Sequence, residues 1–360
     1  MEDLKLFTVG PVACYPEVLE AMGAQMYSHR SDEYLELHYD TVERLQDSLE
    51  TQNHIYLFSS TGTGFMEASV INCVRDSMLA CINGSFGRRF ATVGRAHGRK
   101  VITLEPPLGE PTTPGALEDA LRDHPGVEAV ALTHNETSTG LLNPLEELAS
   151  VVKDQEKLLL VDAVSSMGGT ELRVDDWGID ICFSSSQKCF GVPPGLGIGS
   201  VSPSALKKSE AASNKGWYFD FQNWRNYHER GRGTPMTSAI PQVAGMNAAL
   251  KMIEGHGGKS WYYDLFNKRN RKIRDGIERL GLTTFPEGDY ESPTVSCINA
   301  PKVGGPAVYE AMRGEGFELA QGYGSLKGST FRIGNMGYIP DEDIDSMLEA
   351  LSRVLENLGE

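Results

Sequence analysis

Short apolar runs alternate with helix-like patterns between residues 55 and 200. The runs are apolar at consecutive positions and rich in Val, Leu and Ile, which indicates strands covered on both faces. Between them, apolar residues recur at helical spacing, notably in 61–74, 114–124 and 144–154. Strands that alternate with helices predict a mostly parallel α/β sheet. The expected strands lie in HIYLFSS, SMLACIN, RKVITLE, VEAVALTHNE, KLLLVDAV, IDICFSSS and GLGIGSVS.

The pattern changes after Ser200. An aromatic, polar stretch at 217–227 precedes a long helical region at about 238–281, and strand, helix, strand and helix follow. The last helix is expected to begin at PDED, with acids in its first turn as the helix dipole favours. One apolar stripe follows along it: Ile344, Met347, Leu348, Leu351, Val354 and Leu355.

This division predicts three parts of the chain. We expect an N-terminal arm over residues 1–15, a large α/β domain over 16–255 and a small α+β domain over 256–360. In an open α/β sheet, ligands bind beyond the carboxyl ends of the strands. Polar residues at those ends are therefore the first candidates for a functional site.

Composition and charge exclude several classes of partner. The net charge is −16, which argues against nucleic acid and anionic membranes, because both require basic patches. The first residues, MEDLKLFTVGPV, are not those of a signal peptide, and no apolar stretch approaches the ~20 residues of a membrane helix. The six cysteines have no ligand-like spacing, so we expect reduced thiols, no metal and a cytoplasmic location.

Two strand ends carry groups that suit an anion and a cation. Thr61, Gly62 and Thr63 open a helix after a strand, where backbone N–H groups and hydroxyls make a phosphate cradle; a capped helix start without a ligand is the alternative. Asp162 ends an apolar strand, so its charge requires a partner. That partner is either a structural cap or the protonated ring nitrogen of a cofactor.

Two further strand ends complete the set of candidates. Lys188 lies between IDICFSSS and GVPPGLGIG, where partial burial would make its amine nucleophilic toward an aldehyde; an exposed loop lysine is the alternative. In THNETSTG, residues 135–138 offer hydrogen bonds after a strand that ends near Thr133. A phosphate cradle, an acid and a lysine in this order fit pyridoxal 5′-phosphate.

Over essentially its whole length, the chain resembles the class V, fold-type I pyridoxal-phosphate aminotransferases. It is similar above all to the alanine/serine–glyoxylate (or pyruvate) aminotransferases, and also to 2-aminoethylphosphonate–pyruvate aminotransferase. The resemblance implies a large domain with a mostly parallel mixed sheet between helices, and a smaller C-terminal α+β domain. It is carried, in order, by FTVGP, SHRSDEY, THNETSTG, VDAVSSMGG, SSSQKCFGVPPG and FRIGNMG.

The resemblance implies roles for the strand-end residues. Lys188 would be the Schiff-base lysine and proton shuttle, and Asp162 would keep the pyridine nitrogen protonated. Gln187 would lie near the phosphate, which Thr61, Gly62 and Thr63 would cradle.

The resemblance also implies roles for Phe86, Thr137 and Arg332. Phe86 in INGSFG would stack on the pyridine ring, with core packing as the alternative. Thr137 would hydrogen-bond the ring hydroxyl side of the cofactor or the adjacent imine region. Arg332 in FRIGNMG would bind the substrate α-carboxylate with its planar guanidinium.

The family also forms homodimers in which one subunit reaches the cofactor phosphate of the other. In RGTPMTSAIP, Thr237 is the first candidate for that contact, followed by Thr234 and Arg232. Family members often have a tyrosine just before this threonine, whereas here the nearest preceding one is Tyr227. This departure leaves the inter-subunit contact open.

The expected function is a ping-pong transfer of an amino group from serine or alanine to glyoxylate or pyruvate. One alternative is 2-aminoethylphosphonate–pyruvate aminotransferase, because GYGSLKGSTFRIGNMG is similar to those enzymes as well. A cysteine desulfurase or lyase would require a reactive cysteine on a mobile loop, and Cys297 lies in a strand-like run instead. A non-catalytic binding protein is a further alternative, against which Lys188, Asp162 and Arg332 all stand.

Overall fold

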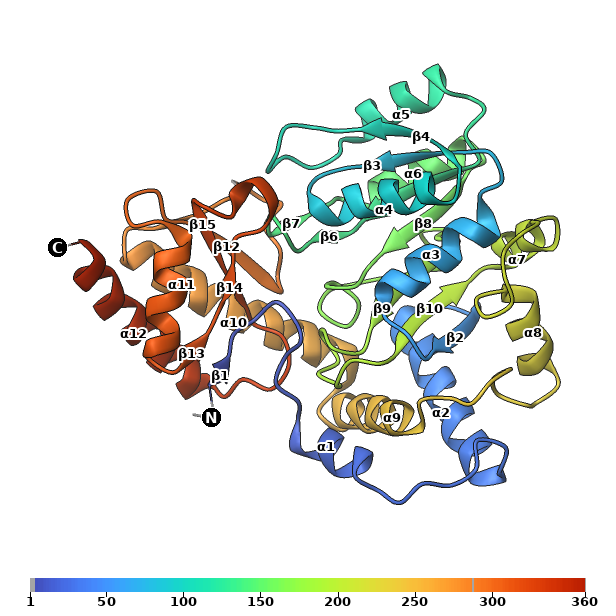
Figure 1. Cartoon of the computed structure of the whole chain (residues 1–360), viewed down its shortest axis with the longest axis horizontal. Helices are drawn as coiled ribbons and strands as arrows, with labels where there is room; N and C mark the ends of the chain where they lie inside the picture. Colours follow the sequence, from blue (N-terminus) through green and yellow to red (C-terminus); the bar gives the residue numbers. More distant parts are fainter. Residues whose placement is uncertain (1–3, 287, 360) are drawn as a thin grey trace.

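A seven-stranded mixed sheet forms the centre of the larger part of the protein. The computed structural model describes residues 4–286 and 288–359 (Figure 1). The strand order is β2-β10-β9-β8-β5-β3-β4, and only β10 runs antiparallel to its neighbours. The mostly parallel sheet expected from the apolar runs is therefore confirmed. Its strands are β2 (His54–Phe58), β3 (Ser77–Cys81), β4 (Lys100–Leu104), β5 (Ala129–Thr133), β8 (Leu158–Asp162), β9 (Ile181–Ser185) and β10 (Gly197–Val201).

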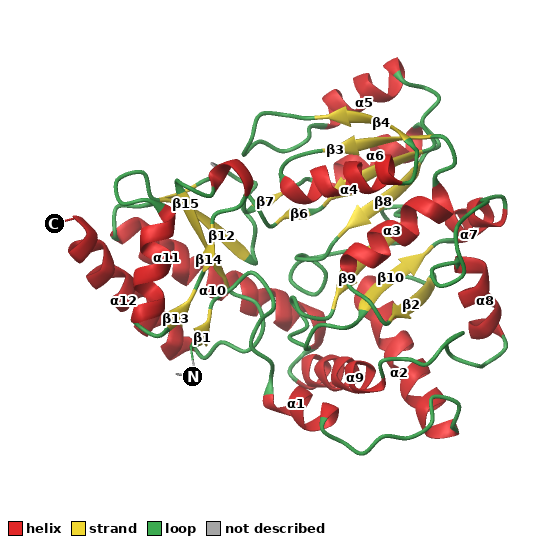
Figure 2. Ribbon diagram, viewed as in Figure 1, coloured by secondary structure: helices red, strands yellow, loops and turns green. Residues whose placement is uncertain are grey.

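Helices cover both faces of this sheet, which explains the continuous apolar runs of its strands. One core lies between the sheet and α2, α5, α6 and α9, and a second lies between the sheet and α3, α4, α7 and α8 (Figure 2). Alternate residues of one strand join different cores: Leu159 and Val161 pack in the first, and Leu160 in the second. The helices are α1 (Pro16–Met22), α2 (Asp32–Leu49), α3 (Gly62–Cys73), α4 (Ser85–Ala96), α5 (Pro114–Asp123), α6 (Leu145–Asp154), α7 (Pro203–Glu210), α8 (Phe221–Glu229) and α9 (Ile240–Gly255).

A four-stranded antiparallel sheet, β11-β12-β15-β14, organises the C-terminal part. Its core contains Ile298, Phe331 and Ile333 from the strands, and the apolar stripe predicted for the last helix packs against them. The elements are α10 (Gly258–Arg279), β11 (Thr283–Thr284), β12 (Val295–Asn299), α11 (Gly305–Gly314), β13 (Phe317–Glu318), β14 (Ala320–Gln321), the 3₁₀ turn η1 (Gly324–Leu326), β15 (Thr330–Gly334) and α12 (Asp341–Gly359).

The long helical region expected at 238–281 is two helices. The helical region is interrupted between α9 and α10 at Gly257, whose φ of 121° lies outside the helical range. The break falls beside the expected boundary at 255/256, but the three-part division itself stays a prediction. Residues 1–3 of the arm and residues 287 and 360 of the small domain lie outside the described residues.

The N-terminal arm lies against the C-terminal part of the molecule. Its short strand β1 (Lys5–Leu6) pairs in parallel with β13, and the N–H of Gly334 donates to the carbonyl of Phe7 (2.8 Å). A short hairpin, β6 (Asn135–Glu136) with β7 (Leu141–Leu142), follows β5. The arm and this hairpin both approach the carboxyl edge of the large sheet, where the candidate residues lie.

Candidate active site

The carboxyl ends of the parallel strands meet at one edge of the large sheet. In register, Thr133 at the end of β5 lies beside Asp162 at the end of β8, and Asp162 lies beside Phe183 of β9. The loop after β9 carries Lys188. Parallel pairing thus brings together side chains that are far apart in the sequence, as the strand-end rule predicts.

Lys188 is almost completely buried, with 8% of its surface exposed. Its Nζ donates to the carbonyl of Val9 in the arm. A Cβ at Gly10 would lie 2.7 Å from Nζ, and Gly10 has a φ of 111°, so this position requires glycine. Burial lowers the pKa of Lys188 to about 8. The amine is therefore neutral in a large fraction of molecules near pH 8, which excludes the exposed-loop alternative.

Competitive acetylation of the cofactor-free protein tests this burial. The reactivity of Lys188 toward acetic anhydride is expected to rise with pH and to level off above about 8, because only the neutral amine reacts. Ordinary exposed lysines, with a pKa near 10.4, should keep gaining reactivity to about pH 10. Peptide mapping by mass spectrometry measures both profiles in one sample, and coincident profiles would contradict the lowered pKa.

Asp162 is a buried acid at the end of β8, with 3% of its surface exposed. One oxygen accepts the N–H of Val164 (2.9 Å). Desolvation raises the pKa of Asp162 to about 7. The hydrogen bond from Val164 opposes this rise, and the charge of nearby Glu136 adds to it. A single backbone donor does not fill the acceptor capacity of a carboxylate, so the group is suited to one further hydrogen-bond donor.

The start of α3 lies next to Asp162 and has free donors. Its N-cap, Thr61, makes no side-chain capping bond, and no acid occupies the first turn. A Cβ at Gly62 would lie 2.5 Å from Cγ2 of Val164, so glycine allows the helix start to approach the loop after β8. Thr61 and Thr63 are exposed. The open helix start fits an anion such as a phosphate.

A fully buried carboxylate, Glu136, fixes the start of α4. It accepts the N–H groups of Phe86 (3.0 Å), Gly87 (3.0 Å) and Ser138 (3.1 Å), as well as the Ser138 hydroxyl. The α3 start is thus left open while the α4 start is capped. Sequence reasoning gave Glu136 only as one of four hydrogen-bonding residues, and its distance of about fifty positions from α4 concealed this role.

Phe86 is half-buried and lies in a stack of four side chains. The Arg89 guanidinium lies 4.8 Å from its ring centroid, and the Tyr323 ring lies 6.0 Å away at an interplanar angle of 22°. Arg332 lies 5.5 Å from the centroid of Tyr323. Phe86 is therefore not a simple core residue, and the stack connects α4 to the C-terminal sheet.

Arg332, in β15, is 5% exposed. Its Nε donates to the carbonyl of Gln321 (3.0 Å) and its Nη1 to that of Thr137 (2.8 Å). No ion pair of Arg332 occurs within residues 4–286 and 288–359. Burial lowers its pKa. A guanidinium with two backbone bonds keeps further donors for a carboxylate.

The other predicted residues lie at several places around this edge. The Thr137 hydroxyl bonds to that of Ser165 (2.7 Å), and Gln187 accepts the hydroxyl of Ser185. Thr237 and Arg232 are exposed, whereas Thr234 is buried and donates to the carbonyl of Met236 (2.7 Å). The structure thus groups Lys188, Asp162, Gln187 and the α3 start at one edge of the sheet, and leaves Thr237 at the surface.

The cysteine proposed for a desulfurase lies inside a sheet. Cys297 pairs with Arg332 across β12 and β15 and is buried. Burial raises the pKa of its thiol to about 11. A buried, protonated thiol in a strand does not meet the requirement for a reactive thiolate on a mobile loop.

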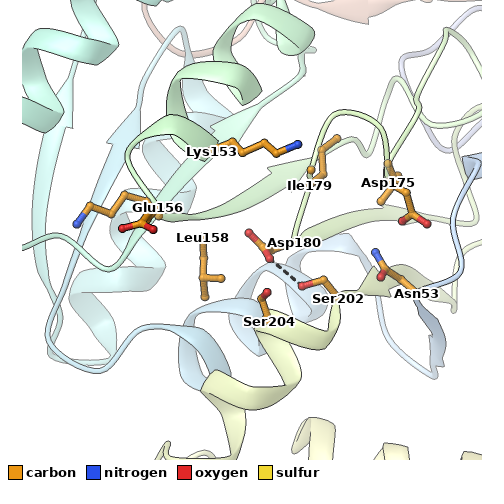
Figure 3. Close-up of a pocket in the computed structure, with 12 residues that line it drawn as sticks. Asn53, Lys153, Glu156, Leu158, Asp175, Ile179, Asp180, Ser202 and Ser204 are labelled. Carbon is orange, nitrogen blue, oxygen red and sulfur yellow. Dashed lines mark hydrogen bonds between the residues drawn. The ribbon is translucent and has the colours of Figure 1, made fainter.

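A hollow of about 530 Å³ lies at the opposite edge of the sheet and is lined in part by Asp175, Asp180 and Ser202 (Figure 3). Asp180 accepts the N–H of Leu159 (2.9 Å) and the Ser202 hydroxyl (2.7 Å), and Asp175 accepts the N–H of Gln52 (2.8 Å). These acids therefore hold the amino ends of the strands together, and the hollow is no competing active site.

Comparison with known proteins agrees with this geometry. Residues 87–347 match the family described as aminotransferase class-V, and the chain belongs to this family. An uncharacterized aminotransferase of Methanocaldococcus jannaschii is 33% identical over 98% of this chain and 93% of its own length. A 2-aminoethylphosphonate–pyruvate transaminase of Bacteroides fragilis is 31% identical over 98% and 99%. The alanine–glyoxylate aminotransferase of Nostoc sp. superposes with a TM-score of 0.94 at 31% identity, over 99% of this chain and 96% of that one.

The protein is accordingly a pyridoxal-phosphate-dependent aminotransferase of fold type I that acts on an amino donor and a 2-oxo acid. The residues present fit the cofactor: a buried amine with a lowered pKa suits its aldehyde, an acid with unused acceptor capacity suits its ring nitrogen, and an open helix start suits its phosphate. Across residues 4–286 and 288–359, no helix is long and apolar enough to cross a membrane.

Proposed function

We propose that this enzyme transfers the amino group of alanine or serine to glyoxylate or pyruvate. The observation that carries the proposal is the position of Arg332: it is buried, without a carboxylate partner in the described ranges, and covered by the Tyr323 ring. A guanidinium in this position suits the carboxylate shared by all four substrates.

The residues would divide the chemistry among them. Bound pyridoxal phosphate supplies an electron-accepting ring that acidifies the α-proton of the donor. Lys188, with its lowered pKa, would take this proton as a base and return it as an acid. Asp162 would hold a proton on the ring nitrogen, and Phe86 would cover one face of the ring. Thr61, Gly62, Thr63 and Gln187 would bind the phosphate, Thr137 would hydrogen-bond the cofactor near its ring hydroxyl, and Arg332 would bind the substrate carboxylate.

We also propose a homodimer in the cytoplasm, with no nucleic-acid or membrane partner. Support for the dimer comes from Thr237, whose exposed side chain on the loop before α9 is open to a second subunit. The net charge of −16 supports the absence of polyanionic partners. The division into an arm (1–15), a large domain (16–255) and a small domain (256–360) belongs to the same proposal.

A half-reaction screen tests the donor. The holoenzyme is mixed separately with L-alanine, L-serine, L-aspartate and 2-aminoethylphosphonate, and the visible absorbance of the bound cofactor is followed. We expect alanine and serine to bleach this absorbance fastest, and glyoxylate or pyruvate to restore it.

The main alternative is transfer from 2-aminoethylphosphonate to pyruvate. The Bacteroides fragilis transaminase named for this reaction is 31% identical to this chain, as is the alanine–glyoxylate aminotransferase of Nostoc sp.. A higher kcat/KM for the phosphonate than for alanine and serine would replace our proposal with that function. No bleaching by any of the four donors would contradict both.

A further inference from the structure

Arg89 is a half-buried arginine beside the site, and the proposed chemistry does not use it. It lies one helical turn beyond Phe86 on α4, and its guanidinium packs over the ring of that residue at 4.8 Å. Its charge influences the pKa of both Asp162 and Lys188, so it faces the same space. Within the described ranges it forms no ion pair, although the chain has 49 acids against 33 Lys and Arg.

The surroundings of Arg89 show why it lacks an acid. Glu67, one turn along α3 from Thr63, is bound instead by His97, with Nε2 and Oε1 2.9 Å apart. The adjacent Arg88 pairs with Glu105 (2.8 Å). Arg89 has only a neutral partner in the described parts of the chain, Thr63, whose Oγ1 accepts from its Nη1 at 3.3 Å. A long bond to a hydroxyl does not balance a guanidinium charge.

In the hydrogen bond between Arg89 and Thr63, the arginine is the donor. Because Oγ1 accepts from Arg89, the hydroxyl proton of Thr63 is free to donate to another group. Thr63 lies in the first turn of α3, where the N-cap makes no side-chain bond and no acid is present. The Arg89 cation, the free hydroxyl proton of Thr63 and the open N–H groups in the first turn of α3 therefore all lie around the same small region.

We propose that Arg89 is a further cofactor-binding residue, which places its charge beside the phosphate at the α3 start and orients the Thr63 hydroxyl to donate to it. The inference rests on the proposed phosphate position at Thr61–Thr63. A phosphate with nearly two negative charges is the partner that a planar, unpaired guanidinium binds well. Arg89 thus joins the phosphate end of the site to Phe86, which covers its ring end.

Binding measurements on the cofactor-free protein test this role without turnover. The wild type, Arg89→Met, Arg89→Lys and the control Arg88→Met are titrated with pyridoxal 5′-phosphate and with pyridoxal, which lacks the phosphate. We expect Arg89→Met to raise the Kd for pyridoxal phosphate about 10- to 100-fold and to leave that for pyridoxal unchanged. Arg89→Lys should recover part of the loss, since it keeps the charge without the planar fork. Arg88→Met should bind as the wild type does.

Two outcomes overturn the inference. Equal weakening of both ligands would show that Arg89 acts only through the Phe86 ring, and an unchanged Kd for pyridoxal phosphate would show that it is a bystander. If Arg89→Met unfolds, Arg89→Gln, which can still donate to Thr63 without the charge, provides the same comparison. The donor screen and the binding test can also give different answers. If Arg89→Met weakens only pyridoxal phosphate but the enzyme accepts none of the four donors, the proposed reaction is wrong and the role of Arg89 in phosphate binding stands.

Discussion

Replacement of Lys188 by alanine is expected to lower aminotransferase turnover by at least about 10³-fold, because the step that moves the α-proton loses its acid and base. Burial makes this amine unusual: its pKa falls to about 8, and it has no neighbouring lysine in the loop to replace it. The single-turnover rate of the half-reaction measures the effect directly. Added methylamine should restore part of the rate, since a small amine can occupy the space left by the side chain.

Lys153→Ala is the matched control, because Lys153 lines the hollow at the opposite edge of the sheet (Figure 3). It should retain the wild-type rate. A Lys188→Ala enzyme within tenfold of the wild type would refute the assignment, and so would a lost rate that no amine restores in a correctly folded, cofactor-loaded variant.

Asp162→Asn is expected to lower turnover by about 10²- to 10³-fold while the protein remains folded. Asparagine still accepts the N–H of Val164, but it cannot hold a proton on the ring nitrogen. Single-turnover kinetics at saturating donor isolate this effect from binding.

Asp162→Asn is expected to lower turnover without lowering the stability of the folded protein. The pKa of Asp162 is about 7 in the folded protein, above the 3.9 of an unfolded aspartate, so the folded state binds the extra proton between about pH 4 and 7. Stability from this group falls as the pH rises through that window, and at pH 8 a buried charge remains. Cofactor-free Asp162→Asn should therefore unfold at a Tm no lower than the wild type at pH 8.

Asp180→Asn separates this effect from buried aspartates in general. Burial raises the pKa of Asp180 as well, but its oxygens hold Leu159 and Ser202 at the amino edge of the sheet. It should lower Tm and leave the turnover per folded enzyme unchanged. A fall in Tm without loss of turnover in Asp162→Asn would place Asp162 in the same structural class.

The apolar runs were sufficient to predict the large sheet, because a strand covered on both faces leaves a local signature. Lys188 and Asp162 could be found for a related reason: polar residues that directly follow such runs lie at strand ends. The break at Gly257 was missed although EGHGGKS interrupts the apolar positions between Ile253 and Trp261, and the change in direction depends on positive φ values at Gly257 and Gly258.

Contacts between distant segments were not predictable from any local pattern. Lys188 bonds to Val9, 179 positions away, and Glu136 caps a helix that begins about fifty positions earlier. The unpaired charge of Arg89 gave no signal either, because only the structure shows that Glu67 is bound by His97 and Glu105 by Arg88. The sequence was thus sufficient to predict which residues carry the chemistry, but not which distant residues bind them and shift their pKa values.

The arm connects the lysine to the C-terminal part of the molecule. The carbonyl that receives the Lys188 amine lies two residues beyond Phe7, whose N–H donates to Glu318 and whose carbonyl accepts from Gly334. Through these backbone bonds, the peptide unit that holds the amine takes its position from β13 and β15. The environment of the lysine therefore depends on how the C-terminal part is placed against the large sheet.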